Sequence, residues 1–146
     1  MATDILDILR AKSKDEKNYL LKDHLKETIS RAIQLREFIN QNNFVTYHKF
    51  DNDFFEDLVV ACFLHDLGKI NFNFQKDVFR EEEKESENLK RIKDFFGDYN
   101  KIEIKDHEVI SLLYSLIFLD NDIRAKKIRT AILLHHYNEF YMNRDS

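Results

Sequence analysis

Apolar residues recur along most of this chain at the three- and four-residue spacing of amphipathic helices. The sequence has no proline and two glycines, Gly68 and Gly97, so strong helix breakers are rare. The pattern predicts helices over 5–12, 17–40, 54–65, 104–119 and 123–136, and a charge-rich segment over 80–93 that is a solvated helix or a mobile loop. We therefore predict an all-α fold, with one compact helical bundle over residues 1–146.

The same periodicity predicts which side chains these helices bury. One side of the second helix is expected to carry Leu20, Leu21, His24, Ile29, Ile33 and Phe38. The last helix is expected to supply core contacts from Ile128, Ala131, Ile132 and Leu134. Asp53 precedes the third helix and is predicted to be its N-cap.

Composition sets broad limits on the class of protein. The 146 residues suit one domain with a single core, and 23 basic against 27 acidic residues give a net charge of −4. No overall basic bias indicates nucleic acid, although two bound divalent cations would add positive charge that this count omits. One cysteine, Cys62, excludes an intramolecular disulfide and favours a reducing compartment. Without a signal-like N-terminus or a membrane-length apolar stretch, we expect a cytoplasmic protein with no membrane partner.

Candidate chemistry is concentrated in the histidines. Five of the six stand at four places, which are His24, the run His65-Asp66-Leu67-Gly68-Lys69, His107 and the pair His135-His136. Imidazole and carboxylate groups are suitable ligands for first-row divalent metals, and one aspartate can bridge two ions. The intervals along the chain allow a separate helix to supply each ligand, so the cluster would be tertiary. The set predicts a dinuclear metal site that hydrolyses a phosphate ester.

The end of the third helix is expected to shape this site. Adjacent His65 and Asp66 would supply two ligands from one backbone turn. Gly68 would let the chain leave the helix sharply, because glycine tolerates a positive φ at a C-terminal cap. Lys69 would then lie close to the metals, where its cation could meet a phosphate oxygen.

With Phe74-Gln75 a few residues further on, these positions resemble the HD superfamily of metal-dependent phosphohydrolases. The ordered set is most similar to the HD nuclease of type I CRISPR interference, which in many systems is fused to a superfamily 2 helicase and in others is a separate polypeptide. The resemblance covers about 20–138 and implies the compact HD helical bundle, with the metal site between helices.

Position by position, the resemblance implies two metal ions. His24, His65 and Asp66 would hold the first, and the second would be held by Asp66, His107, His135 and His136. Lys69 matches the lysine that lies beside the reacting phosphate in the family. Phe72 and Phe74 could stack on bases, although aromatic residues at such positions more often belong to the core.

The family cuts single-stranded DNA in CRISPR antiviral defence, with manganese, nickel, cobalt, iron or magnesium in different members. The histidine-rich set makes magnesium the least natural of these ions. Implied partners are single-stranded DNA, a superfamily 2 helicase and the CRISPR RNA-guided surveillance complex. No helicase is expected within this chain, because Gly68-Lys69 lacks a preceding glycine-rich phosphate loop.

One family feature is missing from its usual place. The family completes the first metal site with an aspartate from a helix well downstream of the histidine pair, whereas this chain ends 146 − 136 = 10 residues after His136. Asp145, in a polar tail, is the one candidate. The pattern leaves open a fragment or a reduced family member that lacks C-terminal helices, and it predicts a weak or empty first site.

Two other functions stay open at this stage. One is an HD phosphohydrolase that acts on nucleotides or cyclic dinucleotides, but the cyclic-dinucleotide branch expects Gly-Tyr-Pro where Tyr137-Asn138-Glu139 stands. The other is a non-catalytic HD module in a larger effector complex. His48 falls outside the metal pattern and is read as a loop residue, and the acidic run 81–85 is read as a solvated face.

Overall fold

The computed structural model describes residues 4–12, 19–42, 52–97, 104 and 106–136. In chain order the elements are η1 (Ile5–Asp7), α1 (Leu21–Gln41), α3 (Asn52–Leu64), η2 (Leu67–Lys69), α4 (Phe72–Val78), η3 (Glu81–Glu83), α5 (Glu87–Phe96), α6 (His107–Phe118) and α7 (Ile123–Leu134). Apart from one isolated bridge between Arg10 and Leu20, these ranges contain no β-structure. The predicted all-α class is confirmed.

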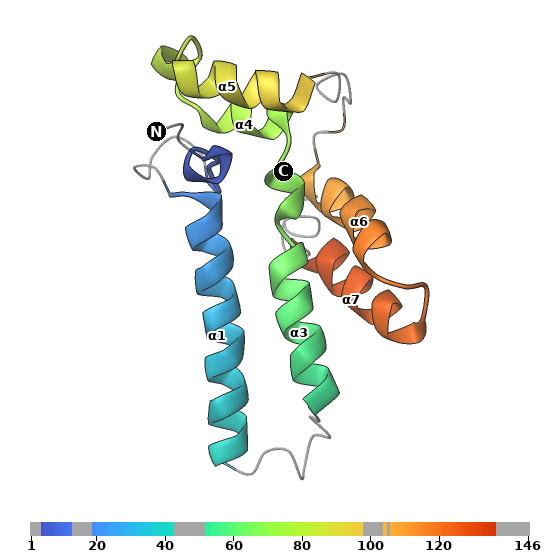
Figure 1. Ribbon diagram of the computed structural model, residues 1–146. Helices are drawn as coiled ribbons and strands as arrows, with labels where there is room; N and C mark the ends of the chain where they lie inside the picture. Colours follow the sequence, from blue (N-terminus) through green and yellow to red (C-terminus); the bar gives the residue numbers. More distant parts are fainter. Residues whose placement is uncertain (1–3, 13–18, 43–51, 98–103, 105, 137–146) are drawn as a thin grey trace, which may run out of the picture.

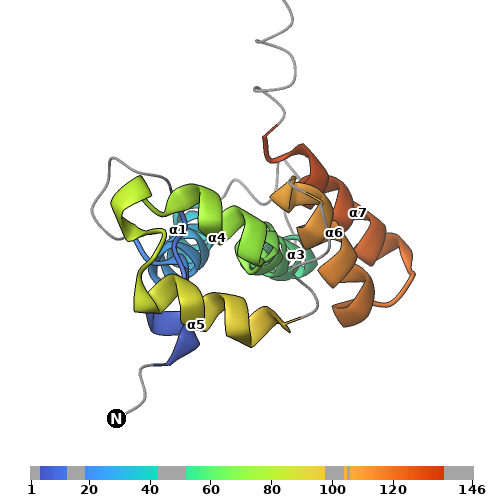
Figure 2. The same cartoon turned by 90° about the horizontal axis from the view of Figure 1, so that it is seen from above.

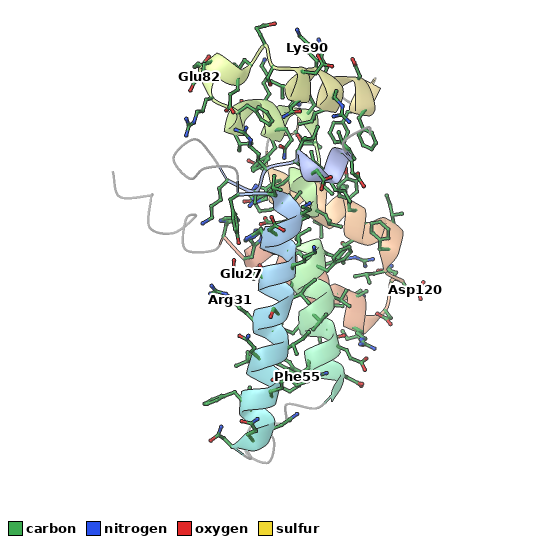
Figure 3. The ribbon with its side chains drawn as sticks, turned by 60° about the vertical axis from the view of Figure 1, so that its left-hand side comes forward. Glu27, Arg31, Phe55, Glu82, Lys90 and Asp120 are labelled. Atoms are coloured by element: carbon green, nitrogen blue, oxygen red, sulfur yellow. The ribbon has the colours of Figure 1, made fainter. Side chains whose placement is uncertain are left out.

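Two long helices form the axis of the molecule. α1 and α3 lie side by side and run in opposite directions (Figure 1). α6 and α7 pack on the other side of α3, and α4 with α5 cover the end where α1 begins and α3 finishes (Figures 1 and 2). The exposed ion pair of Glu27 and Arg31 lies on one flank of α1 (Figure 3). Within the described ranges, no helix is both long and apolar enough to cross a membrane.

Polar side chains begin several of the shorter helices. The Asn71 side chain accepts a hydrogen bond from the Phe74 amide at 2.8 Å at the start of α4. Asp122 does the same for α7, with the Ala125 amide at 2.7 Å. Such caps satisfy amides that have no partner inside the helix, so these sequence positions fix where the helices begin.

Two clusters of buried apolar side chains form much of the core of the described residues. The first joins the N-terminal segment to α1, α4 and α5 through Ile8, Leu9, Ala11, Leu21, Val78, Phe79, Leu89 and Ile92. The second joins α3 to η2 and α7 through Ala61, Leu64, Leu67, Ile128 and Ile132. Leu25 and Ile70 pack against both clusters. The α3–η2 turn, with His65 and Asp66, therefore lies where the two clusters meet.

The predicted helix over 5–12 is wrong. After the short turn η1, the chain is extended, and the Ala11 amide bonds the Tyr19 carbonyl at 2.9 Å. The side chain of buried Gln75 accepts from the Arg10 amide and donates to the Arg10 carbonyl, both at 2.9 Å. These long-range partners replace the bonds that a helix would make, and no local pattern reveals them.

Several finer predictions also need correction. α1 begins at Leu21, later than predicted, and Ile33 and Phe38 are exposed while Ala32 and Ile39 are buried. Asp53 is not an N-cap, because α3 already begins at Asn52. Of the core residues expected on the last helix, Ala131 and Leu134 are exposed, whereas Ile128 and Ile132 are buried. α1 and α7 therefore bury fewer of the predicted side chains than their apolar patterns indicate.

The segment over 80–93 is ordered as the turn η3 followed by α5. Leu89 and Ile92 on α5 are buried, so this helix belongs to the core. Glu83 is not simply solvated, because its two carboxylate oxygens accept from Arg10 at 2.8 and 2.7 Å. This contact, opposed by partial burial, lowers the pKa of Glu83 to about 2 from its ordinary 4.5.

The Arg10–Glu83 pair should make stability depend on pH. Because the folded-state pKa of Glu83 is depressed, its contribution is fully present above about pH 4.5 and is lost as the pH falls towards 2. We expect Glu83→Gln to reduce the free energy of unfolding near pH 7 by about 1 kcal/mol, since the pair is partly exposed. Urea denaturation of both proteins at several pH values should show this difference shrinking below pH 4.5.

Glu82 provides the matched control, because it lies in the same turn with a side chain that is 70% exposed (Figure 3). Glu82→Gln should change stability little at any of these pH values. An equal loss in both variants would contradict the specific role of the Arg10 pair.

Candidate metal centre

One group of possible metal ligands forms between α1 and the end of α3. The Nε2 of His24 lies 2.7 Å from Asp66 Oδ2, and the Nε2 of His65 lies 3.3 Å from the same oxygen. One ligand atom of each residue lies within 4.8 Å of the others. We call His24, His65 and Asp66 the first group.

A second group shares Asp66 but uses its other oxygen. His107 begins α6, and its Nε2 lies 3.2 Å from Asp66 Oδ1, while His135 Nε2 lies 3.6 Å from that oxygen. The Nε2 atoms of His136 and His107 are 3.2 Å apart. Asp66, His107, His135 and His136, again within 4.8 Å of one another, are the second group. The structure therefore brings together all six residues predicted as metal ligands, in the same two sets that the family resemblance implies.

Backbone carbonyls orient two of the rings. His65 Nδ1 lies 2.7 Å from the Cys62 carbonyl oxygen, and His135 Nδ1 lies 2.5 Å from that of Ile132. A carbonyl can only accept, so each Nδ1 carries the proton and donates. With Nδ1 held by a carbonyl, Nε2 is the atom of each ring that faces Asp66 and the one left to ligate a metal, as in sites where a neighbouring acceptor orients the imidazole.

Asp66 is the electrostatic centre of the cluster, and its side chain is 3% exposed. Burial opposes ionisation, but contacts with His107, His135, His24 and His65 outweigh it and hold the pKa of this carboxyl below its ordinary value. Its Oδ1 has no hydrogen bond of good geometry within the described part of the chain. A buried anionic oxygen faced by several imidazole nitrogens is suited to a divalent cation, so these residues fit the metals that the sequence implies.

The two remaining sequence candidates, Lys69 and Phe74, stand beside this carboxylate. Lys69 is 8% exposed, and its Nζ donates to Asp66 Oδ2 at 2.7 Å. The Phe74 ring lies 5.6 Å from that Nζ and 5.4 Å from the His107 ring, and it packs partly buried against the first core cluster. The structure gives Phe74 a place in the core, while a role in base stacking stays a prediction. His48 and Asp145 lie outside the described residues.

Gly68 has a different role from the predicted one. Among the described residues the glycine with positive φ is Gly97, at 48°. Gly68 instead lets η2 approach α6, because an added Cβ would stand 1.8 Å from the His107 carbonyl oxygen and 2.7 Å from the Ser111 amide nitrogen. The Gly68 amide donates to Ser111 Oγ at 2.7 Å. Close backbone packing, rather than a left-handed turn, requires glycine here.

Two residues around the site, Ser111 and Glu108, were not singled out in the sequence, and Gln75 was named there only as part of the family motif. Buried Ser111 holds Gly68, and buried Gln75 bonds the Lys69 carbonyl at 2.9 Å as well as Arg10. Glu108 faces both His107 and His136. Ser111 follows His107 at a spacing of four, which places both on one helix face and was a usable signal. Nothing local indicated the contacts of Gln75.

The fold and the site together define an all-α domain with a buried aspartate–histidine cluster of the kind that binds divalent metal ions. Comparison with known proteins is consistent with this class. The chain is 40% identical over 141 residues, 96% of its length, to the CRISPR-associated nuclease/helicase Cas3 of Methanothermobacter thermautotrophicus. The chain is therefore related in sequence to one part of a Cas3 protein. The match spans 17% of that protein's length.

Two further comparisons gave no match. No model of a known protein family matches the sequence. No solved structure is significantly similar to this fold.

A methyl group at Gly68 should separate η2 from α6. We expect Gly68→Ala to destabilise the protein by about 1–3 kcal/mol or more, because the neighbouring atoms are backbone and cannot rotate away. The same shift should move Asp66 relative to His107 and weaken metal binding. Thermal denaturation and Mn²⁺ titration would measure both effects.

Gly97→Ala is the contrasting variant, because its Cβ would meet no atom within 4 Å and the cost arises from φ alone. It should leave Mn²⁺ affinity unchanged. Equal Mn²⁺ affinity in wild type and Gly68→Ala would contradict the close-packing role.

Proposed function

We propose that residues 1–146 form a single HD nuclease domain that hydrolyses phosphodiester bonds in single-stranded DNA during CRISPR defence. The observation that carries the proposal is the pair of ligand groups sharing the buried carboxylate of Asp66. Similarity to a protein named as a CRISPR-associated nuclease/helicase supports the same function.

The two groups suit two divalent ions. His24, His65 and Asp66 would hold the first ion, and Asp66, His107, His135 and His136 the second, with Asp66 between them. A set rich in imidazole favours manganese, nickel, cobalt or iron over magnesium, which prefers oxygen ligands. When bound, such ions acidify water for attack on phosphorus and stabilise charge on the phosphate oxygens.

The chain's own groups would position the substrate. Asp66 fixes the ligand set because it contacts histidines from four separate segments. Lys69 is held beside Asp66, where its ammonium group would neutralise a phosphate oxygen as charge develops. Phe74, next to Lys69 and His107, would offer an aromatic face to an unpaired base.

The proposed partners are suggested by the size and the name of the related Cas3 protein. The chain corresponds to 17% of a protein whose name includes helicase activity. We propose that a superfamily 2 helicase supplies single-stranded DNA to this domain, in the same polypeptide or a separate one. A CRISPR RNA-guided surveillance complex would select the DNA, and the reaction would take place in the cytoplasm.

The first test is cleavage of labelled single-stranded DNA with Mn²⁺, Ni²⁺, Co²⁺ or Mg²⁺. Asp66→Ala should lower the rate by at least about 100-fold, because it removes the carboxylate that both groups share. Asp66→Asn keeps the side-chain shape and should be similarly inactive, which separates lost charge from lost packing. Asp77→Ala, an exposed aspartate on α4, is the control and should retain activity.

Parallel assays with double-stranded DNA, single-stranded RNA and a cyclic dinucleotide decide among the functions. Preferential turnover of the cyclic dinucleotide would replace the nuclease with a small-molecule phosphohydrolase. DNA binding without turnover in any metal would indicate a non-catalytic module.

Metal titration should resolve the two groups separately. We expect two Mn²⁺ ions per wild-type chain by calorimetry, the ion of the first group being the more weakly bound, with His24→Ala losing the first and His136→Ala the second. Asp66→Ala should lose high-affinity binding at both. Two undiminished ions in His24→Ala and His136→Ala would contradict the ligand assignment.

A further inference from the structure

Glu108 lies beside two histidines of the candidate metal centre and belongs to no pattern identified in the sequence. It lies in the first turn of α6, directly after His107, and its side chain is 12% exposed. A carboxylate this far from water needs favourable charge or hydrogen-bond partners nearby. For Glu108 these partners are histidines of the candidate metal centre.

The two carboxylate oxygens face two different histidines. Oε2 lies 3.7 Å from His107 Nδ1, and Oε1 lies 3.7 Å from His136 Nε2. These separations are longer than a hydrogen bond and correspond to electrostatic contacts. Both histidines belong to the second group, so Glu108 serves that group rather than the first.

The two ring nitrogens of His107 face different carboxylates. Its Nε2 lies 3.2 Å from Asp66 Oδ1, while its Nδ1 is the atom that faces Glu108. A carboxylate beside Nδ1 favours the tautomer that carries its proton there, which leaves the Nε2 lone pair free for the cluster. In His65 and His135 a backbone carbonyl oxygen holds the Nδ1 proton in the same way. Glu108 places a charged oxygen on the corresponding side of His107, at the longer distance of 3.7 Å.

Resting on the metal-dependent function proposed above, we propose that Glu108 is a positioning residue of the second group. It orients His107 and strengthens divalent-cation binding there without itself being a ligand. The alternative is that Glu108 stabilises the start of α6 by its charge alone, as acidic residues in first turns do. Glu87 occupies the first turn of α5 and is exposed, so Glu87→Ala is the matched control.

The test is Mn²⁺ titration by calorimetry of the full chain in a His24→Ala background, which leaves the second group. Glu108→Ala should weaken binding by about 10- to 100-fold, as losses of such outer carboxylates do. Glu108→Gln should weaken it less, because it keeps a partial negative charge on an oxygen near Nδ1, and its similar shape should keep the fold if Glu108→Ala is unstable. In the His136→Ala background, which leaves the first group, neither change should matter.

The absorption spectrum of bound Co²⁺ distinguishes a positioning role of Glu108 from direct ligation. Its band positions should be the same with and without Glu108, because no ligand is lost. Changed bands with loss of binding as large as in His136→Ala would overturn the positioning role in favour of direct ligation. Unchanged affinity in both Glu108 variants, or an equal loss in Glu87→Ala, would also overturn it.

Failure of this inference can be told apart from failure of the proposed function. A wild-type chain that cleaves DNA while its Glu108 variants bind Mn²⁺ normally overturns the inference alone. A chain that binds Mn²⁺ with the expected Glu108 dependence but cleaves no DNA supports the inference and overturns the nuclease.

Discussion

The buried carboxylate of Asp66 is the constraint on which the rest of the structure depends. At 3% side-chain exposure it must be compensated, and the compensation comes from His24, His65, His107, His135 and Lys69. These groups arrive from α1, the α3–η2 turn, the start of α6 and the end of α7. An ionised group in the interior is tolerable only where such partners converge, so the helices must meet at this point.

Two apolar clusters make that convergence possible. One fixes α1 against α4 and α5, and the other fixes α3 against α7, so the turn between α3 and η2 is held from both sides. Gly68 and Ser111 bring α6 into backbone contact with this turn, and Gln75 ties the N-terminal segment to Lys69. The site is thus supported by packing and by hydrogen bonds that span long distances in sequence. A cluster supported in this way is preorganised for cations, because little needs to be ordered on binding.

Most residues of the candidate site could be predicted, because the ligand chemistry of a side chain depends only on its residue type. His65 and Asp66 are adjacent, and the other histidines fall on separate predicted helices, so a shared cluster followed from ligand chemistry. The roles of Gly68, Gln75 and Glu108 were less accessible. Each depends on an atom from another segment, namely the His107 carbonyl, the Arg10 backbone and the His136 ring. Periodicity describes the face of one helix and says nothing about what stands opposite it.

By itself the sequence determined the all-α class, the approximate positions of α1, α3, α6 and α7, and the identity of the ligand-type residues. Those properties follow from spacing, breakers and side-chain chemistry, which are local. Tertiary structure alone decided that 5–12 is not a helix, that Ile33, Phe38, Ala131 and Leu134 stay exposed, and that Gly68 serves close packing. Burial and backbone bonding at these positions depend on residues far away in the chain, so no local preference could have fixed them.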